Sequence, residues 1–186
     1  MRLIEAIYHR RAVRNYTDKD VPRVSVLQLL DAAIQAPSAV NQQPWAFAVF
    51  VGRERLDGFS VRAKAHLLTT LEASPAFSHL RDMLCDPQYN IFHNAGTLVV
   101  ICAKPGGQNP AEDCCLAAQN LMLAAHAIGL GTCPIGFARP WMNLEETKRD
   151  LGIPEALSVV FPITLGFPAE VPPAVPRNPP EIVIWK

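Results

Sequence analysis

Hydrophobic residues recur at helical spacing in some parts of the chain and form unbroken runs in others. Residues 3–7 and 24–36 have a helical period, so each segment predicts a helix, and Pro37 is expected to end the second one. Apolar runs rich in β-forming residues predict three strands, at 45–51, 97–103 and 158–165. These elements predict a single α/β domain over residues 1–186, a length that allows a sizeable core.

The clearest helix start in the sequence lies at residues 109–113. Asn109 is a favoured N-cap residue, Pro110 suits the first helical position, and Glu112 and Asp113 complement the helix dipole. The helix is predicted to run to about Ile128. Because it is apolar around much of its circumference, we expect burial on several sides. Its small alanines permit close helix packing, including packing across a dimer interface.

Other segments carry weaker signals. A more polar helix is predicted over 53–71, and a short helix ending at Gly152 is predicted to be capped by Asn143 together with Glu146. The segment 74–94 predicts no clear element, because prolines and polar residues interrupt it.

The last twenty residues are rich in proline yet end in a strand-like segment. Six prolines between Pro168 and Pro180 exclude a helix, whereas residues 182–185 are Ile-Val-Ile-Trp. A disordered tail rarely ends in this way. We therefore predict an extended arm that crosses a surface and adds a strand to a sheet edge, with a partner subunit as one candidate for that sheet.

Composition excludes several classes of function. The chain has 17 basic and 17 acidic residues and a pI near 7.0, which argues against a nucleic-acid surface. It has no apolar run of the roughly 18 residues that a membrane span needs and no signal-peptide pattern at its start, so we expect a cytoplasmic protein without membrane contact.

The cysteines and histidines predict neither a metal site nor a hydrolase. The five cysteines are an odd number without metal-ligand spacing, and we interpret them as reduced core residues. Cys133 has two interpretations, a packing role and a reactive thiol. The scattered histidines accompany no nucleophile motif, so neither a metal nor a protein catalytic residue is predicted.

Three arginines fall within five residues, at Arg10, Arg11 and Arg14, directly after the first predicted helix. In a chain with no net charge, this concentration predicts a local anion. Forked guanidinium donors bind phosphate in a bidentate manner, so phosphate is the expected guest. The alternative is a solvated basic turn.

A polar loop flanked by prolines follows, from Ala36 to Trp45. Pro44 is expected to hold Gln43 in extended geometry, which would fix the directions of the Asn41 and Gln43 amides. Each amide offers donor and acceptor atoms, as recognition of a flavin or purine edge requires. The alternative is an ordinary helix-to-strand connection.

Together these motifs resemble the nitroreductase family of flavin enzymes. The family's Arg-Arg-x-x-Arg and Ala-Pro-Ser-x-x-Asn-x-Gln-Pro-Trp elements are both present, and the likeness continues through 129–137, 165–168 and Arg177. The resemblance implies an α/β (α+β) nitroreductase-like fold, with a central, mostly antiparallel sheet flanked by helices. It also implies an intertwined homodimer with an exchanged C-terminal arm.

The resemblance further implies an FMN site at the dimer interface, built from three groups of residues. The group expected at the ribityl chain and phosphate is Arg10, Arg11, Ala12, Arg14 and Arg177. The group expected from the other subunit is Ser38, Ala39, Asn41 and Gln43. The group expected along the isoalloxazine ring is Pro134, Ile135 and Gly136. The resemblance also implies that the segment 74–94 lies over the flavin and shapes substrate access.

The activity implied by the resemblance is electron transfer from NAD(P)H to a small-molecule acceptor, such as a nitroaromatic or a quinone, by a ping-pong mechanism on FMN. Two alternatives remain open. The chain could be an FMN-dependent dehalogenase or a flavin-fragmenting relative, or it could bind flavin without turnover, since fold resemblance alone does not fix function.

Overall fold

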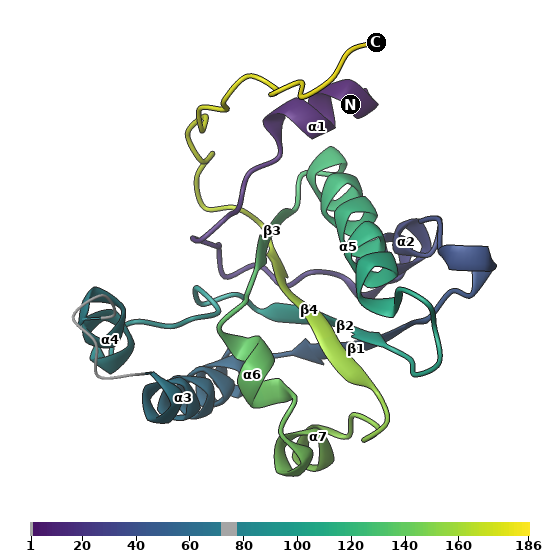
Figure 1. The fold of residues 1–186 in the computed structure, drawn as a ribbon. Helices are drawn as coiled ribbons and strands as arrows, with labels where there is room; N and C mark the ends of the chain where they lie inside the picture. Colours follow the sequence, from purple (N-terminus) through teal and green to yellow (C-terminus); the bar gives the residue numbers. More distant parts are fainter. Residues whose placement is uncertain (1, 72–77) are drawn as a thin grey trace.

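A four-stranded antiparallel sheet forms the centre of this computed structural model, which describes residues 2–71 and 78–186 (Figure 1). Its strand order is β1-β2-β4-β3, and every neighbouring pair is antiparallel. The strands are β1 (Trp45–Val51), β2 (Thr97–Ala103), β3 (Gly131–Pro134) and β4 (Ser158–Gly166). The three predicted strands are confirmed, and β3 is an additional short strand that the sequence pattern did not predict.

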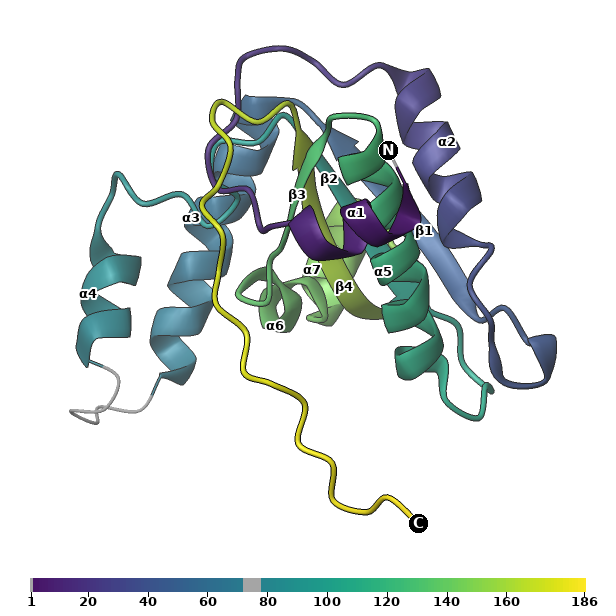
Figure 2. The same cartoon turned by 90° about the horizontal axis from the view of Figure 1, so that it is seen from above.

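Helices cover both faces of the sheet (Figures 1 and 2). One side carries α1 (Leu3–His9), α2 (Arg23–Ala33) and α5 (Pro110–Ala127). The other side carries α3 (Arg53–Thr70), α4 (Ser78–Cys85), α6 (Ala138–Met142) and α7 (Glu145–Leu151). The 3₁₀ turn η1 (Ala39–Asn41) lies between α2 and β1. The predicted mixed fold with a helix-flanked antiparallel sheet is thus confirmed.

Strand β2 is buried on both faces and separates two hydrophobic clusters. Leu98 and Val100 pack into the cluster on the α3 and α6 side, whereas Val99 and Ile101 pack into the cluster on the α2 and α5 side. This alternation follows the two-residue period of a strand. It explains why β2 is an unbroken apolar run in the sequence.

Several helix boundaries differ from the predictions. Helix α2 ends at Ala33, ahead of Pro37, and Asn109 occupies the N-cap position of α5 without a side-chain capping bond among the described residues. The predicted capping role of Asn143 is wrong, because its side chain bonds the backbone N–H and carbonyl of Val159, both at 2.9 Å. Helix α7 does end at Gly152, whose φ of 71° is the left-handed conformation that glycine favours.

The prediction that all five cysteines lie in the core needs correction. Cys102, Cys114 and Cys133 are buried as predicted, but Cys85 and Cys115 are exposed.

The C-terminal arm forms no regular strand within the described chain, and Figure 2 shows the arm leaving the body of the domain. Its addition to a sheet of a partner subunit stays a prediction. Within the segment 74–94, residues 74–77 lie outside the described residues, and α4 is a helix that the sequence pattern did not predict. None of the described helices is both long and apolar enough to cross a membrane.

Candidate functional site

The segment that carries the arginines lies along the sheet as an extra, irregular edge. Ala12 pairs with Thr132 of β3 in a parallel bridge, and the Val13 N–H donates to the Thr132 carbonyl at 2.9 Å. Further along, the Tyr16 hydroxyl donates to the Val13 carbonyl at 2.8 Å and lies 2.9 Å from Thr164 Oγ1. These bonds fix the backbone between Ala12 and Tyr16, and with it the position from which the Arg14 side chain projects.

Two glycines let this segment approach the sheet. A Cβ at Gly131 would lie 2.6 Å from a methyl group of Val13, and a Cβ at Gly166 would lie 2.7 Å from the ring of Tyr16. Both separations are too short for non-bonded carbon atoms. The two glycines therefore serve close packing, since their absent side chains leave the space that Val13 and Tyr16 fill.

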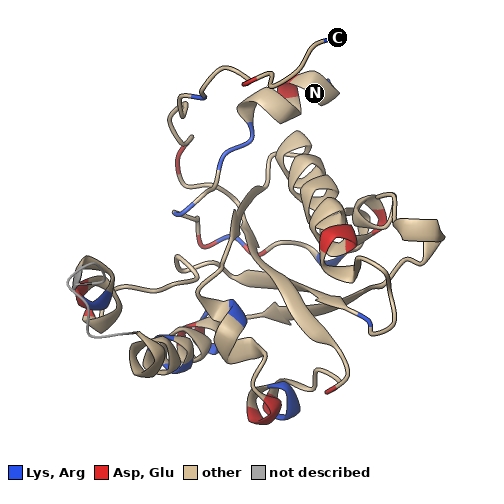
Figure 3. Ribbon diagram, in the orientation of Figure 1, with Lys and Arg blue, Asp and Glu red and all other residues tan. Residues whose placement is uncertain are grey.

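The arginines open onto a groove of about 450 Å³ between this segment and the C-terminal arm. In Figure 3 the basic segment stands out directly after α1. The predicted residues that line the groove are Arg10, Arg11, Ala12, Arg14, Pro134 and Arg177. Burial, and then the charges of Arg11 and Arg177, lower the pKa of Arg10. Among the described residues, no carboxylate forms an ion pair with these arginines.

Arg11 differs from its neighbours in how its guanidinium is used. Its Nη1 donates to the carbonyls of Tyr8 and Arg10, each at 2.8 Å. Tyr8 lies in the last turn of α1, where carbonyl groups lack helical partners. Arg11 thus caps α1 with one arm of its guanidinium while still lining the groove.

A second, open pocket of about 590 Å³ continues from the groove. Arg14, Cys133 and Pro134 line both, so the two spaces are contiguous. The remaining residues of the pocket are Met83, Tyr89, Ile91, His93, Ile135, Gly136 and Phe137. A Cβ built at Gly136 would meet no described atom within 4 Å, so the backbone there faces open space.

Apart from Arg14, whose guanidinium is positively charged, His93 and Cys133 of this pocket are uncharged near neutral pH. Burial, and then the positive charge of Arg14, lower the pKa of His93 to about 4. Burial raises the pKa of the Cys133 thiol, although Arg14 and Arg10 oppose the shift. A protonated, buried thiol favours the packing interpretation of Cys133 over the reactive one. The site therefore combines a strongly basic groove with a largely neutral pocket.

The loop that carries the other predicted residues lies elsewhere. In Figures 1 and 2, η1 stands at the opposite end of the domain from the arginine segment. One bond within the loop and one to α5 hold it: the Gln43 N–H donates to Ser38 Oγ at 2.9 Å, and the Ala39 N–H donates to the carboxylate of Asp113 in α5 at 3.2 Å. Within one chain, Ser38, Ala39, Asn41 and Gln43 do not join the groove.

The conformation of this loop corrects one prediction. Gln43 has a φ of 48°, so it is not extended as the following proline had suggested, and Asn41 has a φ of 55°. Gln43 Nε2 donates to Asn41 Oδ1 at 3.0 Å, which orients both amides. Several non-glycine residues with positive φ in one loop store backbone strain, a feature that clusters at functional sites.

Tyr89, Ile91 and His93 form a wall of the pocket, although no sequence pattern singled out these three residues. They lie in the segment 74–94, which carries no recognisable motif and which only the family resemblance assigned to the region over the flavin. The one available signal is the spacing of two positions between Tyr89, Ile91 and His93, which would place their side chains on one side of an extended segment. No group of metal-ligating side chains occurs in the part of the chain that the structure describes.

The fold and the site define a mixed helix and antiparallel-sheet protein with a cationic groove that leads into a neutral pocket. The sequence model of the Nitroreductase family matches residues 7–167. The chain therefore belongs to the nitroreductase family.

Individual relatives agree with this assignment. A 4-nitrobenzoate reductase of a Nocardioides species is 48% identical over 193 residues, covering 85% of this chain and 77% of the relative. An FMN reductase [NAD(P)H] of Bacillus subtilis is 27% identical over 190 residues, covering 97% of this chain and 72% of the relative. The crystal structure of a nitroreductase with bound FMN from Bacteroides fragilis superposes with a TM-score of 0.84 at 26% identity, covering 100% of this chain and 98% of that one.

Proposed function

We propose that this protein is an FMN-dependent oxidoreductase that passes electrons from NAD(P)H to a nitroaromatic, quinone or related acceptor. The observation that carries the proposal is the continuity of the basic groove with the neutral pocket through Arg14, Cys133 and Pro134. An elongated cofactor with an anionic end and a planar, uncharged end fits such a site. FMN has this form and, when bound, supplies the hydride and electron transfer chemistry.

The groove suits the phosphate end of FMN. Arg10 and Arg177 are close enough for repulsion to lower the pKa of Arg10, and a phosphate between them relieves that repulsion. Ala12 offers backbone, while Arg11 divides its guanidinium between α1 and the groove. Arg14 lies at the junction of groove and pocket, where the ribityl chain is expected.

The pocket suits the ring end. Pro134, Ile135 and Gly136 form one wall, and the open space at Gly136 allows the isoalloxazine to approach the backbone closely. Because no carboxylate lines this pocket, the protein places no negative charge beside the ring and serves to position it. NAD(P)H and the acceptor are proposed to use this one pocket in turn, as a ping-pong cycle requires.

A second copy of the chain completes the proposed site. Leu3, Ile4 and Ile7 of α1 are 67%, 62% and 47% exposed, and Trp185 at the end of the arm is 86% exposed. Apolar exposure of this extent suits a dimer interface. We propose an intertwined homodimer with exchanged arms, in which Ser38, Ala39, Asn41 and Gln43 reach the flavin of the other subunit.

The proposed acceptor class is a nitroaromatic with a carboxylate substituent. Arg14 and the neutral His93 line the pocket beside the apolar Met83 and Phe137, a combination that accepts an aromatic ring with an anionic end. The 48% identity to a 4-nitrobenzoate reductase supports the same class.

Dependence on NAD(P)H and five free cysteines support the prediction of a cytoplasmic protein.

Two anaerobic half-reactions test the proposal. NADPH or NADH added to the FMN-loaded protein should bleach the flavin absorption, and 4-nitrobenzoate added next should restore it. Bound flavin that neither nucleotide reduces would establish a non-catalytic flavin protein. Flavin that is reduced but reoxidised only by a halogenated aromatic, with release of halide, would establish the dehalogenase alternative.

A further inference from the structure

Helix α3 carries a stripe of polar residues on one face. Arg53, Asp57, Ser60 and Lys64 are spaced by four, three and four positions, so they lie above one another along the helix. Ser60 and Lys64 are only 3% and 8% exposed. A buried serine and a buried lysine on a helix whose other buried residues are apolar require polar partners.

Every member of the stripe bonds the same loop, 86–94. Lys64 Nζ donates to the carbonyls of Asp86 and Tyr89, at 2.8 and 2.7 Å. The Ile91 N–H donates to Ser60 Oγ at 3.0 Å.

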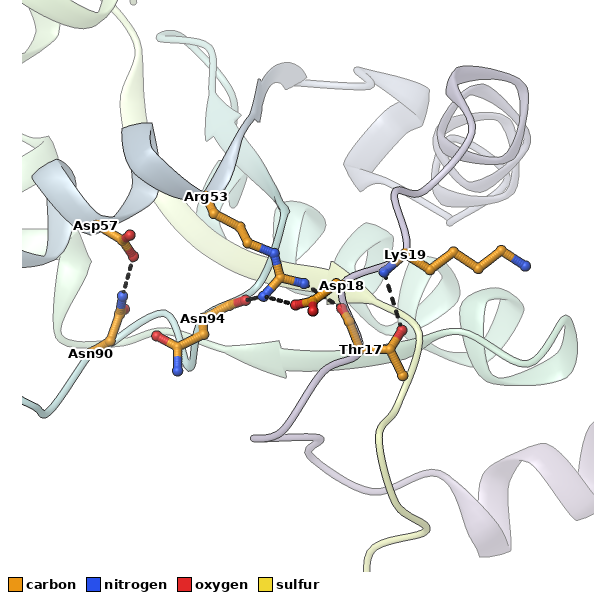
Figure 4. Close-up of polar contacts among 7 residues, drawn as sticks. All are labelled: Thr17, Asp18, Lys19, Arg53, Asp57, Asn90 and Asn94. Atoms are coloured by element: carbon orange, nitrogen blue, oxygen red, sulfur yellow. Dashed lines mark hydrogen bonds and ion pairs between the residues drawn. The ribbon is translucent and has the colours of Figure 1, made fainter.

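The other two bonds are drawn in Figure 4. Asn90 Nδ2 donates to Asp57 Oδ1 at 2.6 Å, and Arg53 Nη1 donates to the Asn94 carbonyl at 2.8 Å. The stripe thus holds the loop at five points along its length.

The loop needs this external support. His93 and Asn94 have φ values of 55° and 57°, a left-handed conformation that is uncommon for residues other than glycine. Such a conformation persists where the surroundings impose it. Three side chains of this loop, those of Tyr89, Ile91 and His93, form a wall of the pocket next to the groove.

We propose that the polar stripe of α3 positions the Tyr89–His93 wall and thereby sets affinity for the electron acceptor. None of its four residues lines the pocket, so they act as positioning residues. Lys64 is the central member, because it satisfies two loop carbonyls at once and has no carboxylate partner among the described residues. This inference rests on the proposed reductase function.

Arg53 has an additional connection. It also donates to the Thr17 carbonyl and pairs with Asp18 at 3.2 Å, as Figure 4 shows. Thr17 follows the arginine segment of the groove, so Arg53 joins the two halves of the site. The side-chain hydrogen bonds of Lys64 and Ser60 go only to the loop 86–94, which makes these two residues the cleaner test.

The test compares Lys64→Met with Lys148→Met in the FMN-loaded protein. Lys148 is a matched control, because it is also 8% exposed and donates to a carbonyl, that of Glu155 at 3.0 Å, but lies in α7 away from the pocket. Lys64→Met should raise KM for 4-nitrobenzoate by about tenfold, the size expected for loss of charged hydrogen bonds, with kcat and FMN content within about twofold of wild type. Lys148→Met should leave KM unchanged.

Ser60→Ala provides a milder variant for the case in which Lys64→Met does not fold. It should raise KM by about threefold and speed hydrogen exchange of the Ile91 amide. An unchanged KM in Ser60→Ala or Lys64→Met, with faster exchange in the loop, would overturn the proposal, as would an equal rise in KM for Lys148→Met.

A binding readout separates this inference from the reductase proposal. Benzoate titrated into the oxidised, FMN-loaded protein reports on the wall through the flavin spectrum and needs no turnover. If the wild type binds benzoate without reducing 4-nitrobenzoate, the reductase function fails, while weaker benzoate binding in Lys64→Met still supports positioning. Equal benzoate affinity in both proteins would contradict it.

Discussion

The two halves of the candidate site are built in different ways. The groove half, around Ala12 to Tyr16, is held by a backbone bridge to β3 and by glycines that allow close contact. The pocket half, around Tyr89 to His93, is held by side chains of α3 that bond loop carbonyls and amides. Backbone pairing fixes a binding element firmly, whereas side-chain support can change without disturbing the sheet. This difference predicts that cofactor binding and acceptor selection can be perturbed separately.

The largest expected effect comes from removing the charge of the groove. The double variant Arg10→Ala/Arg177→Ala should weaken FMN binding by roughly 100- to 10,000-fold, because each of the two charge-assisted hydrogen bonds contributes about 1.5 to 3 kcal/mol. Fluorescence titration of the apoprotein with FMN measures this. Arg149→Ala, an exposed arginine of α7, is the matched control and should bind FMN as the wild type does. Unchanged FMN affinity in the double variant would refute the phosphate assignment.

A smaller effect is expected from filling the space beneath the arginine segment. Gly131→Ala places a Cβ 2.6 Å from Val13, so the segment must shift, which should cost about 1 to 3 kcal/mol of unfolding free energy and weaken FMN binding by about tenfold. Denaturant titration and FMN titration measure the two effects. Gly58→Ala is the control, since its Cβ meets no described atom within 4 Å and should stabilise α3 by about 0.5 to 1 kcal/mol.

The pocket half should respond to pH through His93. Its folded pKa of about 4 lies below the unfolded value of 6.5, so the unfolded chain takes up a proton first as the pH falls. Stability should be complete above about pH 6.5 and decline toward pH 4, by about 1 to 2 kcal/mol after solvent screening of this partly buried ring. His93→Asn, which tolerates positive φ, should flatten this dependence in unfolding titrations at several pH values. An unchanged slope would contradict the assignment.

The smallest effect should come from the Tyr16 hydroxyl. Tyr16→Phe removes its bonds to the Val13 carbonyl and Thr164, which should cost about 1 kcal/mol of stability and two- to threefold in FMN affinity. Tyr8→Phe is the matched control, because Tyr8 is 68% exposed and should tolerate the change. The two variants should therefore differ in thermal stability. An equal loss of stability in both would show that the Tyr16 hydroxyl does not hold the arginine segment.

The same contrast explains what the sequence could predict. The arginine cluster was recognisable because a concentration of charge is a local feature, and strands β1 and β2 because both are continuous apolar runs. Residues 134–136 and the segment 74–94 were assigned to the site through the family resemblance alone. The individual residues of the pocket wall were not recognisable, since their position depends on α3 residues more than twenty positions away in the chain. Asn143 was misread for the same reason: its amide serves β4 instead of the nearby helix.

The loop at Ser38 to Gln43 carries a predicted flavin contact that one chain alone does not form. Its motif predicted contact with flavin, yet the structure places it away from the groove, and the proposed second subunit is what would bring the two together. Its positive φ values could not be foreseen from the sequence. Pro44 favours an extended Gln43, but the bond from the Gln43 N–H to Ser38 and the bond from the Ala39 N–H to Asp113 of α5 outweigh this preference.

The most direct measurement is the visible absorption spectrum of the purified protein, followed by release and identification of its chromophore. We expect a flavin spectrum and FMN in an amount close to that of the chain, either as purified or after FMN is added. A colourless protein that also fails to bind added FMN would contradict the central claim that the basic groove and the neutral pocket form one flavin site.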